Sequence, residues 1–324
     1  MRILADSWES LSAFVPAGTS WTKRRVPDLE ESEEWLWRAL TESSVAQTTE
    51  LAVDAPLTLW RRLLVIGDAA RSQFDVLHEA LGRGSILDGP TAVVALRGDG
   101  FHGQRGRPWW TCRGNLFLTA GLCVKASAES LVPGLIMLPA VAVVDAIRIG
   151  VGARARPGIK WVNDILINGC KVAGVLTATL CRDSLLEAAV LGVGVNVAQA
   201  PTIEPTPFVP AAGCLKDAGI EMTLPGFTWC LLGRLAERYR VLLEEGPGEL
   251  LQSYREASCV VGRRVRVWDE STDLLGAKDA WPAPLAAGIV TSVEPDLSLR
   301  IDGRESPVVK GRLALEEDCR MLGL

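Results

Sequence analysis

Three short passages of the sequence combine residue types that could do chemistry. The first, from Arg97 to Trp109, places glycines and arginines between two segments that look like strands. Glycine lets backbone N–H groups approach a ligand closely, and arginine makes bidentate contacts with phosphate or carboxylate. The passage therefore predicts an anion-binding loop, although a flexible surface loop with incidental arginines has the same composition. It is not a P-loop, because the GK[ST] ending and the following helix are both absent.

The second passage, from Lys160 to Leu176, carries an Asn-Asp pair and two lysines. The dipeptide Asn168-Gly169 stands between its apolar halves and predicts a tight hairpin. Asp164 and Lys171 could then approach each other across adjacent strands. Such a pair is either a structural ion pair or a site where the carboxylate manages a metal or a proton while the ammonium neutralises an anion.

The third passage, from Gly192 to Val197, places glycines at alternate positions of a predicted strand. Alternate glycines remove the side chains from one face of a strand and leave a flat floor against which a ring or a chain could lie. A strand packed closely on a helix would show the same pattern.

The elements that position these passages follow from the hydrophobic pattern. After residue 263 the pattern takes a period of two, which predicts a small β-barrel. Residues 1–56 should form an arm that covers the core, with one short helix after Pro27. The expected strands are 62–67, 91–97, 115–124, 159–167, 171–180 and 187–197, and the expected helices are 68–81, 133–151 with a bend or break at Pro139, 225–245 and 248–258.

Composition limits the possible partners and the compartment. The chain has 324 residues with 34 basic and 39 acidic side chains, and its net charge of −5 argues against nucleic acid as the primary partner. The opening residues lack the apolar stretch of a signal peptide. The longest apolar run, 131–147, is interrupted by two prolines and an aspartate, so we expect no membrane span. Eight cysteines without a CxxC pair indicate reduced thiols in a cytoplasmic protein rather than a zinc site.

Taken in this order, the three passages resemble the catalytic domain of the biotin protein ligases, in the superfamily that also holds lipoate ligases and octanoyl transferases. The family's GRGRxGRxW-like loop is matched by Gly103–Trp109, and its KWPND motif by Lys160–Asp164. Its K(V/L)xGIL segment is matched by Lys171–Leu176, and its GxGxN motif by Gly192–Asn196. The resemblance implies an α+β fold with a mixed β-sheet catalytic domain (57–258) flanked by helices, after an N-terminal extension (1–56), and a small C-terminal SH3-like β-barrel (259–324).

The chain departs from the family pattern at the places that face the acyl group. Asp68–Gln73 stands where the family has a Ser-Thr-Asn cluster that contacts the ureido ring of biotin. Phe101 and His102 stand where glycine and arginine are typical, and Gln104 replaces a basic residue. These differences leave the ATP side largely intact, and they keep a lipoate or octanoate ligase, or a non-catalytic binding module, open as alternatives.

The resemblance implies a two-step reaction in which ATP activates biotin as biotinyl-AMP, and a lysine of the biotin carboxyl carrier domain of a carboxylase then takes the biotinyl group. Lys171 would bridge the carboxylate and the α-phosphate, and neither nucleic acid nor a membrane is expected as a partner. The residues so implied are Lys171, Asp164 and Arg105 for catalysis; Gly103, Gln104, Arg105, Gly106, Arg107, Trp109, Lys160, Asn163, Gly174, Val175, Gly192, Gly194 and Asn196 for contacts with substrate or ATP; and Asp164 and Asn196 for Mg²⁺.

Overall fold

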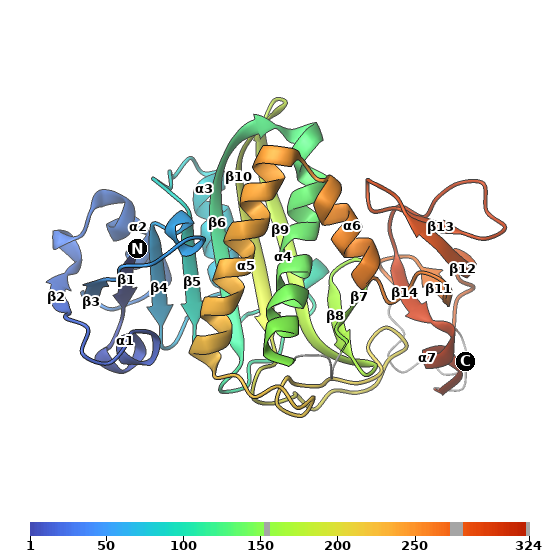
Figure 1. Cartoon of the computed structure of the whole chain (residues 1–324), viewed down its shortest axis with the longest axis horizontal. Helices are drawn as coiled ribbons and strands as arrows, with labels where there is room; N and C mark the ends of the chain where they lie inside the picture. The colour runs from blue at the N-terminus through green and yellow to red at the C-terminus, as the bar shows by residue number, and fades with distance from the viewer. Residues whose placement is uncertain (152–155, 273–280, 322–324) are drawn as a thin grey trace.

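A mixed sheet of ten strands runs through most of the molecule, and a four-stranded antiparallel sheet follows it near the C-terminus (Figure 1). The computed structural model describes residues 1–151, 156–272 and 281–321. The large sheet consists of β1 (Arg2–Ala5), β2 (Thr22–Arg25), β3 (Val45–Glu50), β4 (Arg62–Ile66), β5 (Thr91–Ala95), β6 (Leu116–Ser127), β7 (Gly158–Lys160), β8 (Asp164–Ile167), β9 (Cys170–Arg182) and β10 (Leu185–Val195), in the order β2-β3-β1-β4-β5-β6-β10-β9-β8-β7. The predicted α+β class is confirmed.

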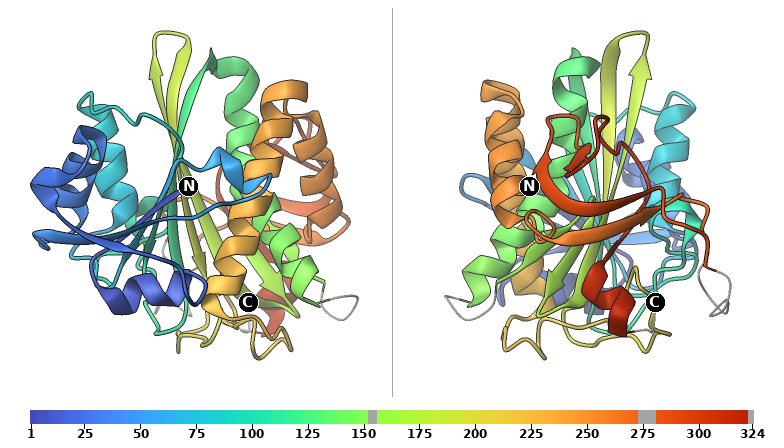
Figure 2. Two further views of the ribbon diagram at one scale, coloured as in Figure 1. Left: turned by 60° about the vertical axis from the view of Figure 1, so that its left-hand side comes forward. Right: turned by 90° about the vertical axis from the view of Figure 1, so that its right-hand side faces the viewer.

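Helices cover both faces of the large sheet, as the end-on view in Figure 2 shows. The longest helices, α4 and α5, lie on one face, and α3 lies on the other. Ser72 caps α3 by accepting a hydrogen bond from the backbone N–H of Asp75, so this helix begins at Gln73 and not at Asp68 as expected. The helices are α1 (Trp8–Phe14), α2 (Glu31–Leu40), α3 (Gln73–Gly82), α4 (Ala128–Val151), α5 (Leu224–Glu245), α6 (Gly248–Ala257) and α7 (Glu316–Met321).

Helix α4 is the buried helix of the core. Its segment Ala128–Gly150 is long and apolar enough to cross a membrane, but 72% of the relevant window is buried inside the protein. The helix packs on the sheet and on α5 and α6, which accounts for its apolar surface. Pro133 and Pro139 both lie inside one continuous helix, so of the bend or break expected at Pro139 the break does not occur.

The hairpin that carries the second passage forms as predicted. Asn168 and Gly169 both have positive φ, at 51° and 80°, which is the conformation of a two-residue type I′ turn between β8 and β9. The segment 159–167 is not one strand, however. It divides into β7 and β8, which pair antiparallel through a turn at residues 161–163, because the chain reverses direction there.

The N-terminal residues are part of the large sheet. Strand β1 pairs parallel with β4 and antiparallel with β3, and β2 forms the outer edge beyond β3. The expected helix in this region is present as α2. The boundary expected at residue 56 remains a prediction, and the sheet itself continues across it without a break.

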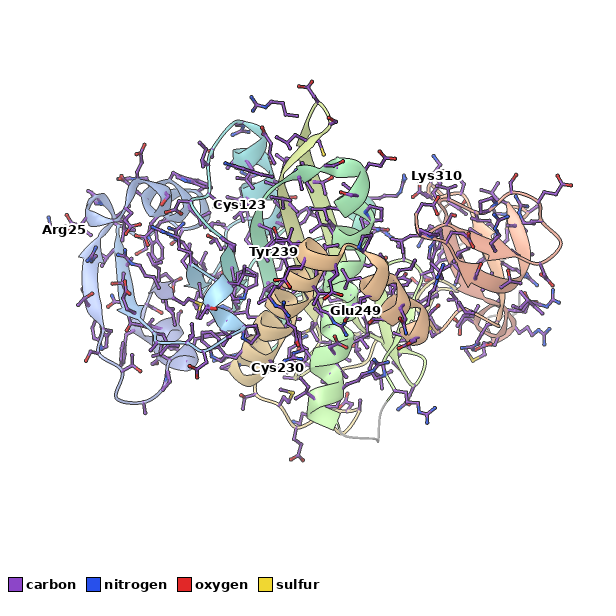
Figure 3. The ribbon with its side chains drawn as sticks, turned by 45° about the horizontal axis from the view of Figure 1, so that its top comes forward. Arg25, Cys123, Cys230, Tyr239, Glu249 and Lys310 are labelled. Atoms are coloured by element: carbon purple, nitrogen blue, oxygen red, sulfur yellow. The ribbon has the colours of Figure 1, made fainter. Side chains whose placement is uncertain are left out.

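The C-terminal sheet packs against the rest of the chain. It contains β11 (Arg264–Trp268), β12 (Ala286–Val293), β13 (Leu299–Ile301) and β14 (Arg312–Leu315), in the order β13-β12-β11-β14. The indole N–H of Trp161 donates to the carbonyl of Leu297 at 2.6 Å, and one hydrophobic core continues from the large sheet into this sheet. Figure 3 shows how far the two ends of the molecule lie apart, with Arg25 of β2 at one end and Lys310 at the other.

Candidate active site

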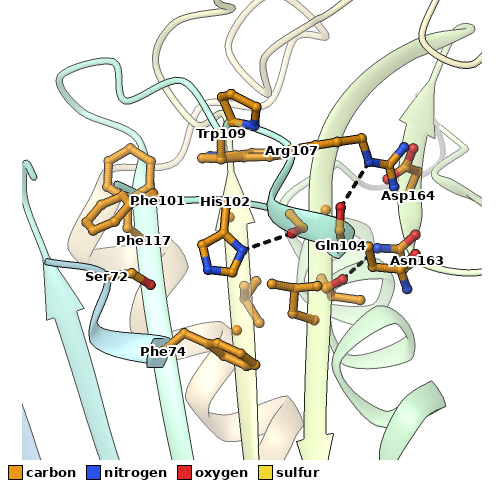
Figure 4. A pocket seen from close by; sticks show the side chains of 18 of the residues that line it. Ser72, Phe74, Phe101, His102, Gln104, Arg107, Trp109, Phe117, Asn163 and Asp164 are labelled. Atoms are coloured by element: carbon orange, nitrogen blue, oxygen red, sulfur yellow. Dashed lines mark hydrogen bonds between the residues drawn. The ribbon is translucent and has the colours of Figure 1, made fainter. Parts of the chain in front are cut away.

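A cavity of about 210 Å³ lies between the start of α3, the loop 101–109 and the strands β9 and β10 (Figure 4). The glycine-rich first passage supplies one wall, and the second and third passages supply the opposite wall and the floor. The three passages singled out in the sequence therefore meet at one place. The residues predicted from the sequence that line the cavity are Gly103, Gln104, Arg107, Trp109, Asn163, Asp164, Lys171, Gly174, Val175, Gly192 and Gly194.

The glycines of β9 and β10 create the flat floor, and the protein's own aromatic rings lie on it. A Cβ atom added at Gly194 would come within 2.6 Å of the Trp109 indole, and one at Gly174 within 2.9 Å. A Cβ at Gly192 would come within 2.9 Å of the Phe74 ring. These distances are too short for any side chain, so the glycines are required for the rings to reach the sheet. Trp109 in turn forms an aromatic wall for a ligand.

Lys171 and Asp164 form an ion pair inside the cavity. The Lys171 ammonium lies 2.6 Å from an Asp164 carboxylate oxygen, and the two side chains are 20% and 19% exposed. The same ammonium lies 5.4 Å from the centroid of the Trp109 ring, within range of a cation–π interaction. A cation held between an aromatic face and a carboxylate, at the edge of an open cavity, is well placed to meet an anionic ligand.

Two further contacts shape the walls beside this pair. The Arg107 guanidinium donates from Nε to the carbonyl of Gln104 at 3.0 Å, and its side chain reaches across the cavity towards Asp164 (Figure 4). Asn163 donates from its amide to the carbonyl of Val175 at 2.8 Å. The backbone N–H of Val175 donates back to the carbonyl of Asn163, so the turn between β7 and β8 is fixed against β9.

Two loop residues that were expected at the site do not line the cavity. Arg105 has a left-handed backbone conformation, with φ at 59°, and its guanidinium forms an ion pair with Glu270 on the C-terminal side. Gly106, which follows it, is exposed and does not line the cavity. The resemblance implies that Arg105 contacts the reacting groups. In the structure its side chain points away from the cavity, because the turn at 104–106 directs it outward.

Lys160 and Asn196 are also outside the cavity, since both are buried structural residues. Lys160 is 2% exposed and donates from Nζ to the carbonyl of Phe208 at 2.6 Å, and burial lowers the pKa of its ammonium. Asn196 donates to the carbonyl of Gly213 and accepts from the Asn115 amide. Both side chains fasten the segment after β10 to the sheet, and neither is directed at a ligand.

Gln73 is the most informative residue that the sequence reasoning missed. It is 3% exposed, lines the cavity and donates from Nε2 to the carbonyl of Phe117 at 2.8 Å. That bond fixes the orientation of the amide, and it leaves Oε1 buried without a hydrogen-bond partner. Gln73 belongs to the segment Asp68–Gln73, which stands where the family has a ligand-contacting cluster. Because the residue types of this segment differ from those of the cluster, Gln73 was not predicted as a site residue. The other lining residues that were not predicted include Ser72, Phe74, Phe101, His102, Phe117 and Arg312.

The acidic groups of the site favour a metal shared with a ligand over a metal held by protein alone. The described residues contain no group of three or more His, Cys, Asp or Glu side chains that could hold an ion. Asp164 is the acidic side chain among the described cavity residues. Mg²⁺ commonly binds to one or two carboxylates together with substrate phosphates, and one carboxylate fits that arrangement.

Comparison with known sequences identifies relatives of this chain. The model of the Biotin/lipoate A/B protein ligase family matches residues 71–196. A biotin--[acetyl-CoA-carboxylase] ligase of Mycobacterium tuberculosis is 30% identical over 261 residues, which cover 78% of this chain and 88% of that protein. The bifunctional ligase/repressor BirA of Bacillus subtilis is 31% identical over 184 residues, which cover 56% of this chain and 55% of that protein.

Comparison with solved structures agrees on the fold. A biotin protein ligase from Aquifex aeolicus, in complex with biotin and ATP, superimposes with a TM-score of 0.58 at 20% identity. The match covers 79% of this chain and 99% of that structure. A second structure, a biotin protein ligase-like protein of unknown function from Silicibacter, gives a TM-score of 0.55 at 13% identity. About four fifths of this chain therefore follows a known fold.

Proposed function

This chain belongs to the biotin/lipoate A/B protein ligase family, and from that membership we propose that it is an ATP-dependent ligase that attaches biotin to a carrier protein. Relatives at 30–37% identity named biotin--[acetyl-CoA-carboxylase] ligase support this assignment. The acceptor would be a lysine of the biotin carboxyl carrier domain of a carboxylase. The cytoplasm, which supplies ATP and keeps thiols reduced, is the proposed location.

The unpaired amide oxygen of Gln73 is the observation that favours biotin over other acids. A buried acceptor without a partner costs roughly 1–3 kcal/mol, so a ligand that donates a hydrogen bond there recovers that cost. The ureido group of biotin carries N–H donors, whereas lipoic and octanoic acids carry none. Gln73 also stands where the family contacts the ureido ring. Of the acids that the sequence left as alternatives, biotin therefore fits this cavity best.

The remaining cavity wall suits the apolar part of such a ligand. Phe101 and Phe117 pack with their ring centroids 5.1 Å apart, and Phe74 and Trp109 lie on the glycine floor. Aromatic walls with a few polar groups are typical of small-molecule sites. We infer that the rings of biotin would lie near Gln73 and that its carboxylate would point towards Lys171.

In the first step, a carboxylate oxygen of biotin would attack the α-phosphorus of ATP. A new O–P bond forms while the bond to pyrophosphate breaks, which gives biotinyl-AMP. Because both reactants are anionic, the step requires fixed positive charge at the point where they meet, and Lys171 would supply it. Arg107 reaches across the cavity towards the same point and would bind phosphate oxygens.

In the second step, the amine of the acceptor lysine would attack the acyl carbon, forming an amide while AMP leaves. Trp109 and the loop 101–109 would cover the adenylate and exclude water, since water would hydrolyse the mixed anhydride. Mg²⁺, when bound with ATP, neutralises phosphate charge, and Asp164 is the residue that would hold it. Asp164 would also hold the Lys171 ammonium in place before the ligand arrives.

Pyrophosphate release from ATP, measured separately with biotin, lipoate and octanoate, tests the proposal. We expect release with biotin alone at low acid concentration, and a Gln73→Met variant should raise the KM for biotin about tenfold. Gln47→Met is the matched control, because Gln47 in β3 is also buried with an unpaired amide oxygen but lies outside the cavity. Equal release with lipoate or octanoate would favour the alternative ligases, and no release with any acid would favour a binding module.

A further inference from the structure

His102 lies in the cavity wall with a hydrogen-bond acceptor next to each ring nitrogen. Its Nδ1 is 2.9 Å from the carbonyl oxygen of Gly103, and its Nε2 is 2.9 Å from both carboxylate oxygens of Asp75. A carbonyl and a carboxylate can only accept. A neutral imidazole has a single N–H, so it could satisfy just one of these two contacts, whereas the imidazolium satisfies both.

Asp75 is the α3 partner of His102 in this contact. It lies in the first turn of α3, where the helix dipole favours negative charge, and its backbone N–H donates to the capping hydroxyl of Ser72. The imidazolium of His102 and the carboxylate of Asp75 therefore form a charge-assisted contact between the loop 101–109 and α3. Both of these elements line the cavity.

Hydrogen bonds between its two arms hold the loop 101–109 together. A contact that fixes one residue of this loop therefore fixes the others as well. The backbone N–H of Gly103 donates to the carbonyl of Arg107 at 2.7 Å, and that of Trp109 donates to the carbonyl of Phe101 at 2.8 Å. His102 and Pro108 form a bridge between the two arms. The loop carries Gln104, Arg107 and Trp109 into the cavity, and its contact with Asp75 sets their distance from the floor.

The other ionisable groups near His102 do not replace this contact. His78 of α3 is exposed and stacks on the far side of Phe74, at 6.3 Å between ring centroids. Across the cavity Lys171 is paired with Asp164, and Arg107 reaches away from His102 towards that pair (Figure 4). Both nitrogens of His102 are engaged within the protein, so its ring is not available to bind the ligand directly.

We propose that His102 is a positioning residue whose protonated form fastens the ligand-covering loop to α3, so that binding of the acid substrate weakens as the pH rises and the imidazolium loses its proton. The identity of the acid substrate rests on the proposed function, whereas the geometry of the contact between His102 and Asp75 comes from this chain alone. It gives a histidine the position where the family has an arginine, but with a role inside the protein rather than on the ligand.

The pKa of His102 is raised above its ordinary value of 6.5, mainly by the hydrogen bond to the Gly103 carbonyl and then by Asp75. A raised pKa in the folded state means that the contact is complete below pH 6.5 and is lost as the pH rises through the folded pKa. The effect therefore lies above pH 6.5.

The first experiment measures the titration directly, without any ligand. The chain has two histidines, so a His78→Gln variant leaves His102 as the single source of histidine ring resonances in an NMR titration. We expect a midpoint above 6.5 in this variant, and a lower midpoint when Asp75→Asn is added. A midpoint at or below 6.5, or one that Asp75→Asn does not change, would overturn the proposal.

The second experiment follows the KM for biotin between pH 6 and pH 9 in pyrophosphate release. The parent and the His78→Gln control should show a rise of about fivefold, from loss of the charge-assisted contact. His102→Arg should keep a low KM across the range, and His102→Gln a high one. A pH profile in His102→Gln that matches the parent would contradict the proposal. If biotin is not the substrate, this assay fails in every variant while the NMR titration still gives its answer.

Discussion

The ammonium of Lys171 lies 2.6 Å from the carboxylate of Asp164, across the hairpin whose turn is Asn168-Gly169. The two residues are not directly opposite in the register, since Asp164 pairs with Gly174 and Lys171 with Leu166. A register shift between Ile165 and Leu166 accompanies this pairing. The ion pair therefore depends on the hairpin, and Asp164 holds the cation beside Trp109 before any ligand binds.

Replacing Lys171 with alanine should remove the positive charge at the point where the two anionic substrates meet. We expect adenylate formation to fall by ~10²–10³-fold, which is typical for loss of one preorganised electrostatic contact. The measurement is single-turnover pyrophosphate release, and Lys125→Ala is the control, because Lys125 is exposed on β6 and outside the cavity. Adenylate formation at the parental rate would show that Lys171 has only a structural role.

Replacing Asp164 with asparagine separates its two possible roles. If Asp164 takes part in the reaction, turnover and its dependence on Mg²⁺ should both decrease, since the amide keeps the shape and loses the charge. If the pair is structural only, the change should cost ~1–3 kcal/mol of stability and leave turnover unaltered. We expect the first result, and comparison of thermal midpoints with turnover at several Mg²⁺ concentrations decides between them.

Replacing Gln104 with arginine should slow the escape of the acyl-adenylate. Gln104 lines the cavity from the loop, and Arg105 beside it is paired with Glu270, so Arg107 is the arginine that the loop 101–109 directs into the cavity. A guanidinium at position 104 would add a charge-assisted contact of ~1.5–3 kcal/mol to phosphate or carboxylate. Release of labelled adenylate without acceptor measures the off-rate. An unchanged off-rate would mean that this side chain does not face the adenylate.

Ending the chain at Ser258 tests whether the C-terminal sheet is a separate folding unit. The truncation removes the partner of the buried Trp161 indole and also Arg312, which lines the cavity. We expect the thermal midpoint to fall by roughly 5 °C or more, since 1 kcal/mol corresponds to about 2–4 °C in a chain of this size. A truncated protein with the parental midpoint would instead support an independent domain at 259–324.

Local signals in the sequence predicted the site-bearing part of the fold well. The Asn168-Gly169 turn and the alternate glycines at Gly192 and Gly194 act through backbone conformation and the absence of a Cβ atom, which are properties of the residues themselves. The resemblance to the biotin protein ligases, and not these signals, assigned Lys171 and Trp109 to one site, and both line the cavity. The ion pair between Asp164 and Lys171 followed from the hairpin alone.

Lys160, Asn196 and Arg105 lie outside the cavity because a distant segment determines where each side chain lies. Lys160 looked like a ligand contact, but its ammonium is used by the carbonyl of Phe208, 48 residues away. Asn196 is held by Asn115 and Gly213 in the same manner. The direction of Arg105 depends on a single left-handed residue and on Glu270, which no local pattern indicates. Strands β2 and β3 are polar, with β2 at the edge of the sheet and β3 beside it, so they lack the alternation that marks a half-buried strand.

Strand β1 also occupies the edge of β4 at which a strand from another copy of the protein could otherwise pair. All five residues of β4 are buried, and β1 covers its backbone edge in parallel register. Removing residues 1–50 would leave β4, with its apolar residues 63–66, as an uncovered edge strand, the kind of surface on which other copies stack through intermolecular strands. We therefore expect a chain without its first fifty residues to associate with itself more readily than the full chain does.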